Sequence, residues 1–383
     1  MTLPMASNDA CSSRLTIDLD ALRANYRTIA DRIAPARCGA VVKADAYGLG
    51  VARAAPALYR EGCRAFFVAQ LCEAPPLARA VGPDAAIFVL NGLDPGSEAA
   101  CARAGFLPVL NSLSQLDRWR ALARAERRPL PAALQVDSGM SRLGLSQGEA
   151  IALAGDSGFA REVDLRLLMT HLACADEPQR AANAEQRARF DAVRAHFPAV
   201  PASIANSGGA FLPPDYHYDL ARPGIALYGA DPGPHATGLR AVVRLDARVL
   251  QIRRIAAGTG VGYGLDHIAA APQRLATIAL GYADGWPRSL SDVGAAWHRG
   301  TRLPIAGRVS MDSLTVDITA LPGDALAEGD FVELLGPSQS LADAARDAGT
   351  IAYELLTRLG ARHARAYIEN NGVTHRFAPG ESA

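Results

Sequence analysis

The stretch AFFVAQLCEAPPLARAVGPDAAIFVLNG, residues 65–92, holds two short apolar runs with a helical segment between them. Residues 65–70 and 85–92 have the length and the aromatic and β-branched content of buried strands. Residues 74–81 have the composition of a helix. Two strands joined in this way form a βαβ unit, in which the strands run parallel.

The same alternation continues on both sides of this unit. Further strands are predicted at 39–44, 106–112, 132–139, 164–172, 201–207 and 217–224, with helices after Gly50 and near 180–196, and an opening strand lies at 15–19. Eight strand–helix units in about 200 residues fit a closed (β/α)8 barrel. A doubly wound open sheet is the alternative. In a barrel, the active site lies at the carboxyl ends of the strands.

The pattern changes after residues 231–238, DPGPHATG, which are rich in glycine and proline and are predicted to form a linker. Beyond them, short strands alternate with glycine and proline turns, and one helix is predicted near 348–359. We therefore expect two domains in an α/β chain. A TIM-type barrel covers residues 14–235, and a smaller β-rich domain covers residues 239–383.

The composition excludes several classes of protein. The 383 residues are 49% hydrophobic, and 39 basic side chains balance 39 acidic ones. A nucleic-acid-binding protein usually has a basic excess. No apolar run reaches the roughly 18 residues that a transmembrane helix needs. Residues 1–14 lack a basic and an apolar segment, so no signal peptide is expected. The six cysteines form no C-x-x-C pair, so free thiols in the cytoplasm are expected instead of a metal site.

One residue count points to chemistry. Of the 39 basic residues, a single one, Lys43, is lysine. Arginine stays protonated in proteins, whereas a lysine amine can lose its proton and act as a base or form a Schiff base. Lys43 follows an apolar strand, where desolvation lowers an amine pKa. Chance survival in an arginine-rich composition is the alternative.

Other polar side chains also follow predicted strands. Arg142 offers a planar fork for a carboxylate, or forms a surface ion pair. His171 is a structural histidine or a site residue. Asn206 and Ser207 precede two glycines, which form an anion-binding loop or a common turn.

Three more segments carry candidates. Tyr47 is placed to bind a phosphate or is a packed aromatic residue. Arg222 precedes Pro-Gly, and the backbone amides of Gly224 and Ile225 are available to a phosphate. In the second domain, the candidates are Tyr263, between glycines, and Met311 with Asp312 in GRVSMDS. A turn aromatic and a buried methionine are the structural alternatives for Tyr263 and Met311.

Nine blocks together resemble the alanine racemases, which are fold-type III pyridoxal phosphate enzymes. They run in family order from about residue 14 to residue 367: VVKADAYG, LQVDSGMSRLGL, THLACAD, ANSGG, ARPGIALYG, VGYG, GYADGWPR, GRVSMDS and IAYELLTRLGAR. The resemblance implies an isomerase that interconverts L- and D-alanine. Its product serves peptidoglycan synthesis, or the enzyme serves alanine catabolism.

The resemblance also implies residue roles. Lys43 forms the internal aldimine and is one base, and Tyr263 is the opposite base, supplied by the partner in a homodimer. Arg142 and Met311 contact the substrate. Arg222 faces the pyridine nitrogen. The implied phosphate-binding set is Tyr47, Ser207, Gly224, Ile225 and Tyr353, and the supporting residues are Asn206, His171, Asp312 and Gln135.

These roles agree with the chemistry. Racemisation needs a proton source on each face of a planar carbanion, and an amine and a phenol on opposite faces exchange roles in the two directions. An arginine at the pyridine nitrogen keeps its own proton. The ring is then a weaker electron sink, which favours return of the proton to Cα over transamination.

The chain departs from the family pattern at several positions. Gln135 stands where the family often has a carbamylated lysine. We expect Gln135 to bond Arg142 through its amide oxygen but without a charge, so that Arg142 is held more loosely. Ser310 replaces a frequent cysteine, and ARHARAY replaces the usual Arg-Val-Pro-Arg pattern.

Three other functions remain open. The first is racemisation of another amino acid, such as serine or a basic one. The second is a non-catalytic pyridoxal phosphate carrier, although a carrier does not need the region beyond the barrel. The third is a fold-type III decarboxylase, which would need an acid instead of Arg222 and a cysteine after Cys174.

Overall fold

The computed structural model describes residues 11–370 and 372–377, and this part of the chain forms two compact units. The first unit consists of Leu22–Leu227 with Asp231–Leu239. The second consists of the described residues up to Ala21, Tyr228–Ala230, and the described residues from Arg240 onward. The opening strand β1 (Ser13–Asp18) thus belongs to the second unit, not to the barrel.

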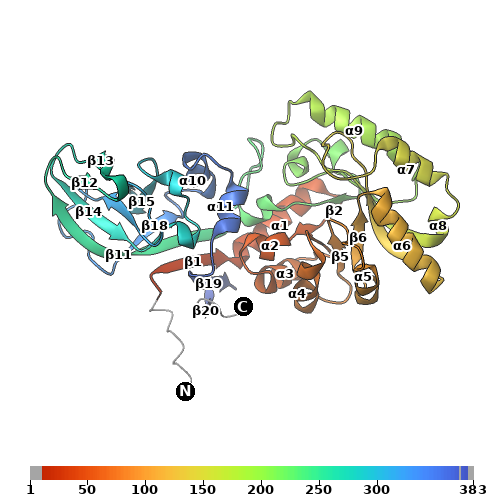
Figure 1. Ribbon diagram of the computed structural model, residues 1–383, viewed down its shortest axis with the longest axis horizontal. Helices are drawn as coiled ribbons and strands as arrows, with labels where there is room; N and C mark the ends of the chain where they lie inside the picture. Colours follow the sequence, from red (N-terminus) through yellow and green to blue (C-terminus); the bar gives the residue numbers. More distant parts are fainter. Residues whose placement is uncertain (1–10, 371, 378–383) are drawn as a thin grey trace, which may run out of the picture. The chain divides into compact units, whose positions relative to one another are not determined.

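The first unit is built on parallel strands in sequence order (Figure 1). The strands are β2 (Arg37–Cys38), β3 (Ala40–Val41), β4 (Ala65–Val68), β5 (Ala86–Val89), β6 (Leu107–Leu110), β7 (Leu130–Gln135), β8 (Val163–Met169), β9 (Ala202–Ser203) and β10 (Leu220–Ala221). Strands β3 to β9 form one sheet, and β10 pairs with β2. The strand interiors are almost fully buried, as expected for parallel strands covered by helices.

Backbone hydrogen bonds close this sheet into a barrel. The Asp219 amide donates to the Ala202 carbonyl at 3.1 Å on one side of β10. On its other side, the Gly39 amide donates to the Ala221 carbonyl at 2.9 Å. The predicted barrel is therefore confirmed, and the open sheet is excluded.

Helical segments precede the first barrel strand and connect the following ones. They are α1 (Leu19–Ile33), α2 (Lys43–Tyr47), α3 (Val51–Arg60), α4 (Ala74–Ala80), α5 (Glu98–Ala104), α6 (Leu113–Glu126), α7 (Gln147–Ala154), α8 (Phe159–Glu162) and α9 (Ala181–Arg194). Ser112 and Ser146 cap α6 and α7 with side-chain bonds to backbone amides, as N-cap serines do.

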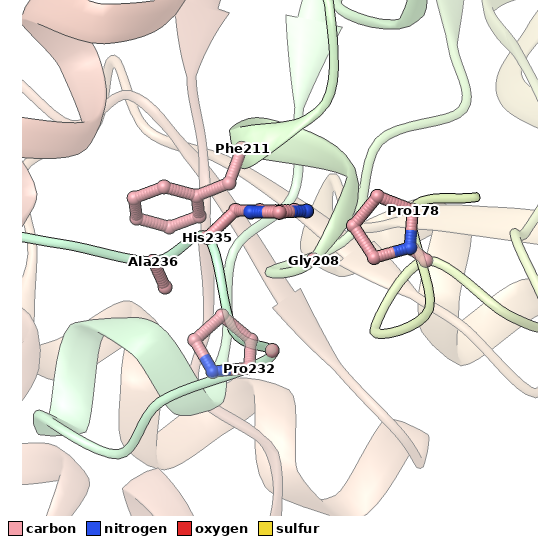
Figure 2. A pocket seen from close by; sticks show the side chains of 8 residues that line it. Pro178, Gly208, Phe211, Pro232, His235 and Ala236 are labelled. Atoms are coloured by element: carbon pink, nitrogen blue, oxygen red, sulfur yellow. The ribbon is translucent and has the colours of Figure 1, made fainter.

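The predicted linker 231–238 is not a free connection. Figure 2 shows His235 of this segment among Pro178, Phe211 and Pro232, with Gly208 and Ala236 beside them. Proline and aromatic faces bury apolar area here, so the segment packs on the barrel unit.

The second unit is a mainly antiparallel assembly around the long strand β11 (Val243–Ile255) (Figure 1). The other strands are β12 (Gly260–Val261), β13 (His267–Ile268), β14 (Gln273–Ile278), β15 (Ala295–His298), β16 (Thr301–Pro304), β17 (Leu314–Asp317), β18 (Phe331–Leu335), β19 (Ala364–Glu369) and β20 (Val373–Phe377). Strand β1 lies between β11 and β19 in the largest sheet. The helix predicted near 348–359 is present as α11 (Ala352–Arg358), and the described part of this unit also holds a helix that was not predicted, α10 (Leu341–Asp347).

Candidate functional site

Lys43 begins a turn of unusual handedness after strand β3. The φ angles of Ala44, Asp45, Ala46 and Tyr47 are 52°, 54°, 55° and 58°, in the left-handed region. Each residue with a side chain costs about 1–2 kcal/mol in a left-handed helix, so four in succession are strained. Strain of this kind gathers at functional sites. The strand predicted at 39–44 is thus wrong at its end, since β3 stops at Val41.

The left-handed turn places Tyr47 against the carboxyl end of the barrel. Its hydroxyl lies so close to Gly224 that a Cβ atom on Gly224 would be 2.2 Å from it. The Ser207 hydroxyl accepts hydrogen bonds from the amides of Gly224, at 2.8 Å, and Ala226, at 3.3 Å. The structure therefore brings together Tyr47, Ser207 and Gly224, with Ile225 next in the chain, as one polar wall, although the Gly224 amide, predicted to be available to a phosphate, donates to Ser207 instead.

Removing the space at Gly224 should weaken the binding of a phosphate group. In Gly224→Ala, the new methyl group must displace the Tyr47 hydroxyl. We expect a loss of affinity for pyridoxal 5'-phosphate of about tenfold or more, and little change for pyridoxal, which has no phosphate. Titration of the cofactor-free protein with both compounds measures this difference.

Gly148→Ala is the matched control for Gly224→Ala, because a Cβ on Gly148 would meet no atom within 4 Å. Equal losses for pyridoxal and its phosphate in Gly224→Ala would show that this wall does not bind phosphate.

Arg222 is a buried cation without a carboxylate. Its side chain donates to the Ser203 hydroxyl and, at 2.6 Å, to the Thr170 carbonyl. No acidic group within the described parts of the chain forms an ion pair with it. Burial lowers the pKa of Arg222 to about 9. A buried charge with neutral partners alone is costly, so the position favours a further acceptor such as a ring nitrogen or an anion.

His171 lies among cations. Arg222 approaches its Nδ1 at 3.5 Å, and the Asn206 amide nitrogen approaches its Nε2 at 3.5 Å. Both neighbours carry donors, so a protonated ring would face donors on each side. Burial, together with the charges of Arg222, Arg142 and Lys43, lowers the pKa of His171 to about 3. His171 is therefore neutral at physiological pH.

This neutral histidine should make the fold sensitive to acid. An unfolded histidine gains its proton near pH 6.5, whereas folded His171 gains one only near pH 3. The unfolded state then binds more protons between these values, so the free energy of unfolding falls as the pH falls. In His171→Gln, we expect the loss of stability between pH 7 and 4.5 to be smaller by about 2–3 kcal/mol. Urea unfolding at both pH values measures it.

His196→Gln, which alters an exposed histidine, is the control and should keep the wild-type pH dependence. An unchanged pH dependence in His171→Gln would contradict a neutral His171.

Arg142 stands on a loop shaped by a carboxylate. Asp137 accepts bonds from the amides of Gly139, Met140 and Ser141 at 2.8, 2.9 and 3.1 Å. Although burial opposes it, these bonds lower the pKa of Asp137. The loop presents an exposed Arg142, which has no hydrogen bond or ion pair to any described residue.

Gln135 does not bond to Arg142 as predicted. Its amide nitrogen donates to the Leu143 carbonyl at 3.1 Å, within the same loop. The backbone of the loop competes successfully for the buried amide, so Gln135 holds the loop and not the guanidinium.

The pKa of the Lys43 amine is lowered mainly by burial and then by the charge of Arg142. The Glu73 carboxylate raises it. The pKa of His171 is lowered by burial and by the charges of Arg222, Arg142 and the half-buried Lys43. The cluster thus combines an amine whose pKa is lowered with two guanidinium groups. Such a set can bind an anionic substrate and transfer a proton.

The other predicted residues belong to the second unit. Tyr263 lies in the turn between β12 and β13 with 72% of its surface exposed. A Cβ on the preceding Gly262 would lie 3.4 Å from the Arg308 amide, so this turn packs beside the segment that leads to Met311. Met311 is 53% exposed, and Asp312 pairs with Arg362 at 2.7 Å. Tyr353, in α11, is 40% exposed.

The barrel residues fit a phosphorylated aromatic cofactor. Arg222 lacks a carboxylate, the polar wall at Gly224 has no room for a side chain, and Lys43 supplies an amine. Such a cofactor has a ring nitrogen and a negatively charged phosphate. Both accept hydrogen bonds, and the barrel residues supply donors for them.

Comparison with known proteins agrees with this arrangement. Residues 17–232 match the profile of the alanine racemase N-terminal domain, and residues 242–367 match that of the alanine racemase C-terminal domain. The chain belongs to the alanine racemase family. An alanine racemase of Brucella canis is 54% identical, over 97% of this chain and 98% of the relative.

Other members of the alanine racemase family extend this result. A catabolic alanine racemase of Mesorhizobium japonicum is 54% identical over 94% of this chain and 95% of its own. The crystal structure of alanine racemase from Bartonella henselae with covalently bound pyridoxal phosphate has a TM-score of 0.90 and 46% identity. The superposition covers 93% of this chain and 99% of the Bartonella henselae chain.

No sequence pattern points to the partners of Arg222, or to Glu73, whose carboxylate accepts a hydrogen bond from the Ala44 amide at 2.7 Å. Ser203 and Thr170 lie inside predicted strand segments, where small hydroxyl side chains are ordinary. Glu73 directly precedes the helix predicted at 74–81, where an acidic residue is equally ordinary. The structure ends β9 at Ser203 and ends β8 at Met169, one residue before Thr170, whereas the predicted strands run on past both residues.

Proposed function

We propose that the chain interconverts L-alanine and D-alanine with pyridoxal 5'-phosphate as cofactor. Membership of the alanine racemase family supports this proposal. The observation that carries it is the sole lysine, half-buried on a strained turn, with its pKa lowered by burial and by Arg142.

Pyridoxal phosphate, when bound, withdraws electrons from Cα of the amino acid and so acidifies its Cα–H bond. Lys43 would hold it covalently. Tyr47, Asn206, Ser207, Gly224, Ile225 and Tyr353 would hold its phosphate side, and Arg222 its ring nitrogen. Arg142 binds the substrate carboxylate through its exposed fork, with Met311 as a further substrate contact. His171, Asp312 and Gln135 support these residues.

Two bases then move the proton. The Lys43 amine takes or gives a proton at one face of Cα, and the Tyr263 hydroxyl does so at the other. Burial and the charge of Arg142 favour the neutral amine that this role requires.

Tyr263 would be supplied by a second copy of the chain. Its turn carries Leu265 and Ile268, which are 58% and 56% exposed, and Met311 is 53% exposed. Exposed apolar side chains of this size are typical of an interface. A homodimer with shared active sites covers them. Within the described residues, no helix is long and apolar enough to cross a bilayer.

The test is to incubate the purified protein and pyridoxal phosphate with L-alanine and to measure D-alanine. Rapid formation supports the proposal. If serine or a basic amino acid is racemised faster, the substrate assignment is wrong. A protein that binds the cofactor and racemises none of them is a carrier.

A further inference from the structure

The turn that follows Lys43 is tied to the next barrel strand by a single carboxylate. One Glu73 oxygen accepts a hydrogen bond from the Ala44 amide at 2.7 Å. The other accepts from the amides of Ala69, at 2.6 Å, and Gln70, at 3.0 Å. Those two residues follow strand β4 directly. Glu73 therefore clamps the first amide after Lys43 to the carboxyl end of β4.

This clamp acts where the backbone is strained. Backbone bonds of the turn run from the Ala46 amide to the Val42 carbonyl at 2.9 Å and from the Gly48 amide to the Ala44 carbonyl at 2.7 Å, and the Gly50 and Leu49 amides donate to the carbonyls of Asp45, at 2.9 Å, and Ala46, at 3.2 Å. The Asp45 carboxylate is directed to the far end, where it accepts from the Val51 amide at 2.7 Å. Glu73 is thus the side chain that anchors the Lys43 end of the turn.

The same carboxylate also acts on the charge of Lys43. Burial and Arg142 lower the pKa of the amine, and within the described residues Glu73 is the acid that raises it. His171, the other titratable group of the cluster, is neutral. Loss of the Glu73 charge would therefore extend the neutral form of Lys43 to lower pH.

We propose that Glu73 is a positioning residue for Lys43, holding the strained turn that carries the amine against the end of strand β4. This role rests on the proposed function of Lys43. It implies that Glu73 affects turnover through the place and protonation of the amine, without touching the substrate.

The test compares two variants. Glu73→Gln loses the charge and one acceptor oxygen, whereas Glu73→Asp keeps the charge on a side chain that is too short to join the Ala44 amide to the end of β4. Glu149→Gln is the matched control, because Glu149 also accepts a backbone amide bond, from Ser146 at 2.8 Å, in a helix cap. We expect kcat to fall by about 10- to 100-fold in both Glu73 variants, with KM little changed. Glu149→Gln should keep the wild-type kcat.

A second readout does not depend on activity. Lys43 is the sole lysine, so reductive methylation with ¹³C-formaldehyde of the cofactor-free chain labels one side-chain amine besides the N-terminus. The pH titration of its NMR signal should shift to lower pH in Glu73→Gln and stay near wild type in Glu73→Asp and Glu149→Gln.

Wild-type kcat and an unshifted Lys43 titration in Glu73→Gln would overturn the proposal. If the wild-type protein racemises no amino acid, the proposed function fails. The Lys43 titration then still decides whether Glu73 acts on the amine.

Discussion

Lys43→Ala will abolish racemisation, with a fall in kcat of at least about 10³-fold. The chain has no second lysine to replace the lost amine. The described neighbours of Lys43 offer no substitute, because a guanidinium group cannot form the Schiff base and His171 lies between donors. Formation of D-alanine from L-alanine measures the rate.

Covalent attachment provides a second measurement on Lys43. After borohydride reduction, intact mass should show one bound cofactor in the wild-type chain and none in Lys43→Ala. Lys43→Arg is the control for charge and size, and it should be equally inactive because arginine does not release its proton. If Lys43→Ala kept more than about a tenth of the wild-type kcat, another group would have to be the base.

Tyr263→Phe will lose racemisation by about 10²- to 10⁴-fold while keeping the cofactor and the fold. The substitution removes one hydroxyl from a side chain that is 72% exposed, so stability should change by less than about 0.5 kcal/mol. Retained cofactor with lost activity would separate an enzyme from a carrier. Unchanged activity would exclude Tyr263 as a base.

Mixing the two inactive variants tests whether sites are shared between copies. In a mixed dimer of Lys43→Ala and Tyr263→Phe, one shared site lacks both groups, and the other has both. Random exchange of subunits should then restore about a quarter of the wild-type activity. If both bases came from one chain, no mixture would regain activity. Tyr282→Phe, which alters another exposed tyrosine of the second unit, is the control for surface substitution.

The alternation of strands and helices could be predicted because it is a local property. Apolar runs such as AFFV and AIFV form strands wherever they can be buried, and the amphipathic segments between them form helices. The candidate side chains Lys43, Arg142 and His171 were found for the same reason, since they follow apolar runs and the carboxyl ends of parallel strands meet.

The errors occur where a contact joins distant parts of the chain. Strand β1 pairs with β19 in the register Arg14↔Ala364, although it precedes the barrel in sequence. Gln135 was expected to bond to Arg142, but the Leu143 carbonyl takes its amide. No local pattern ranks such competing partners.

The barrel, the β-rich second unit and the chemistry available to the chain follow from residue order, because periodicity and residue type are properties of short segments. The sole lysine is the clearest example. How these groups are held follows only from the folded chain. The left-handed turn after Lys43 has no glycine among Ala44–Tyr47 to announce it. Its anchor, Glu73, is 29 residues from Ala44 along the chain. A strained backbone persists only when contacts from the rest of the fold over-determine it, and those contacts exist only after folding.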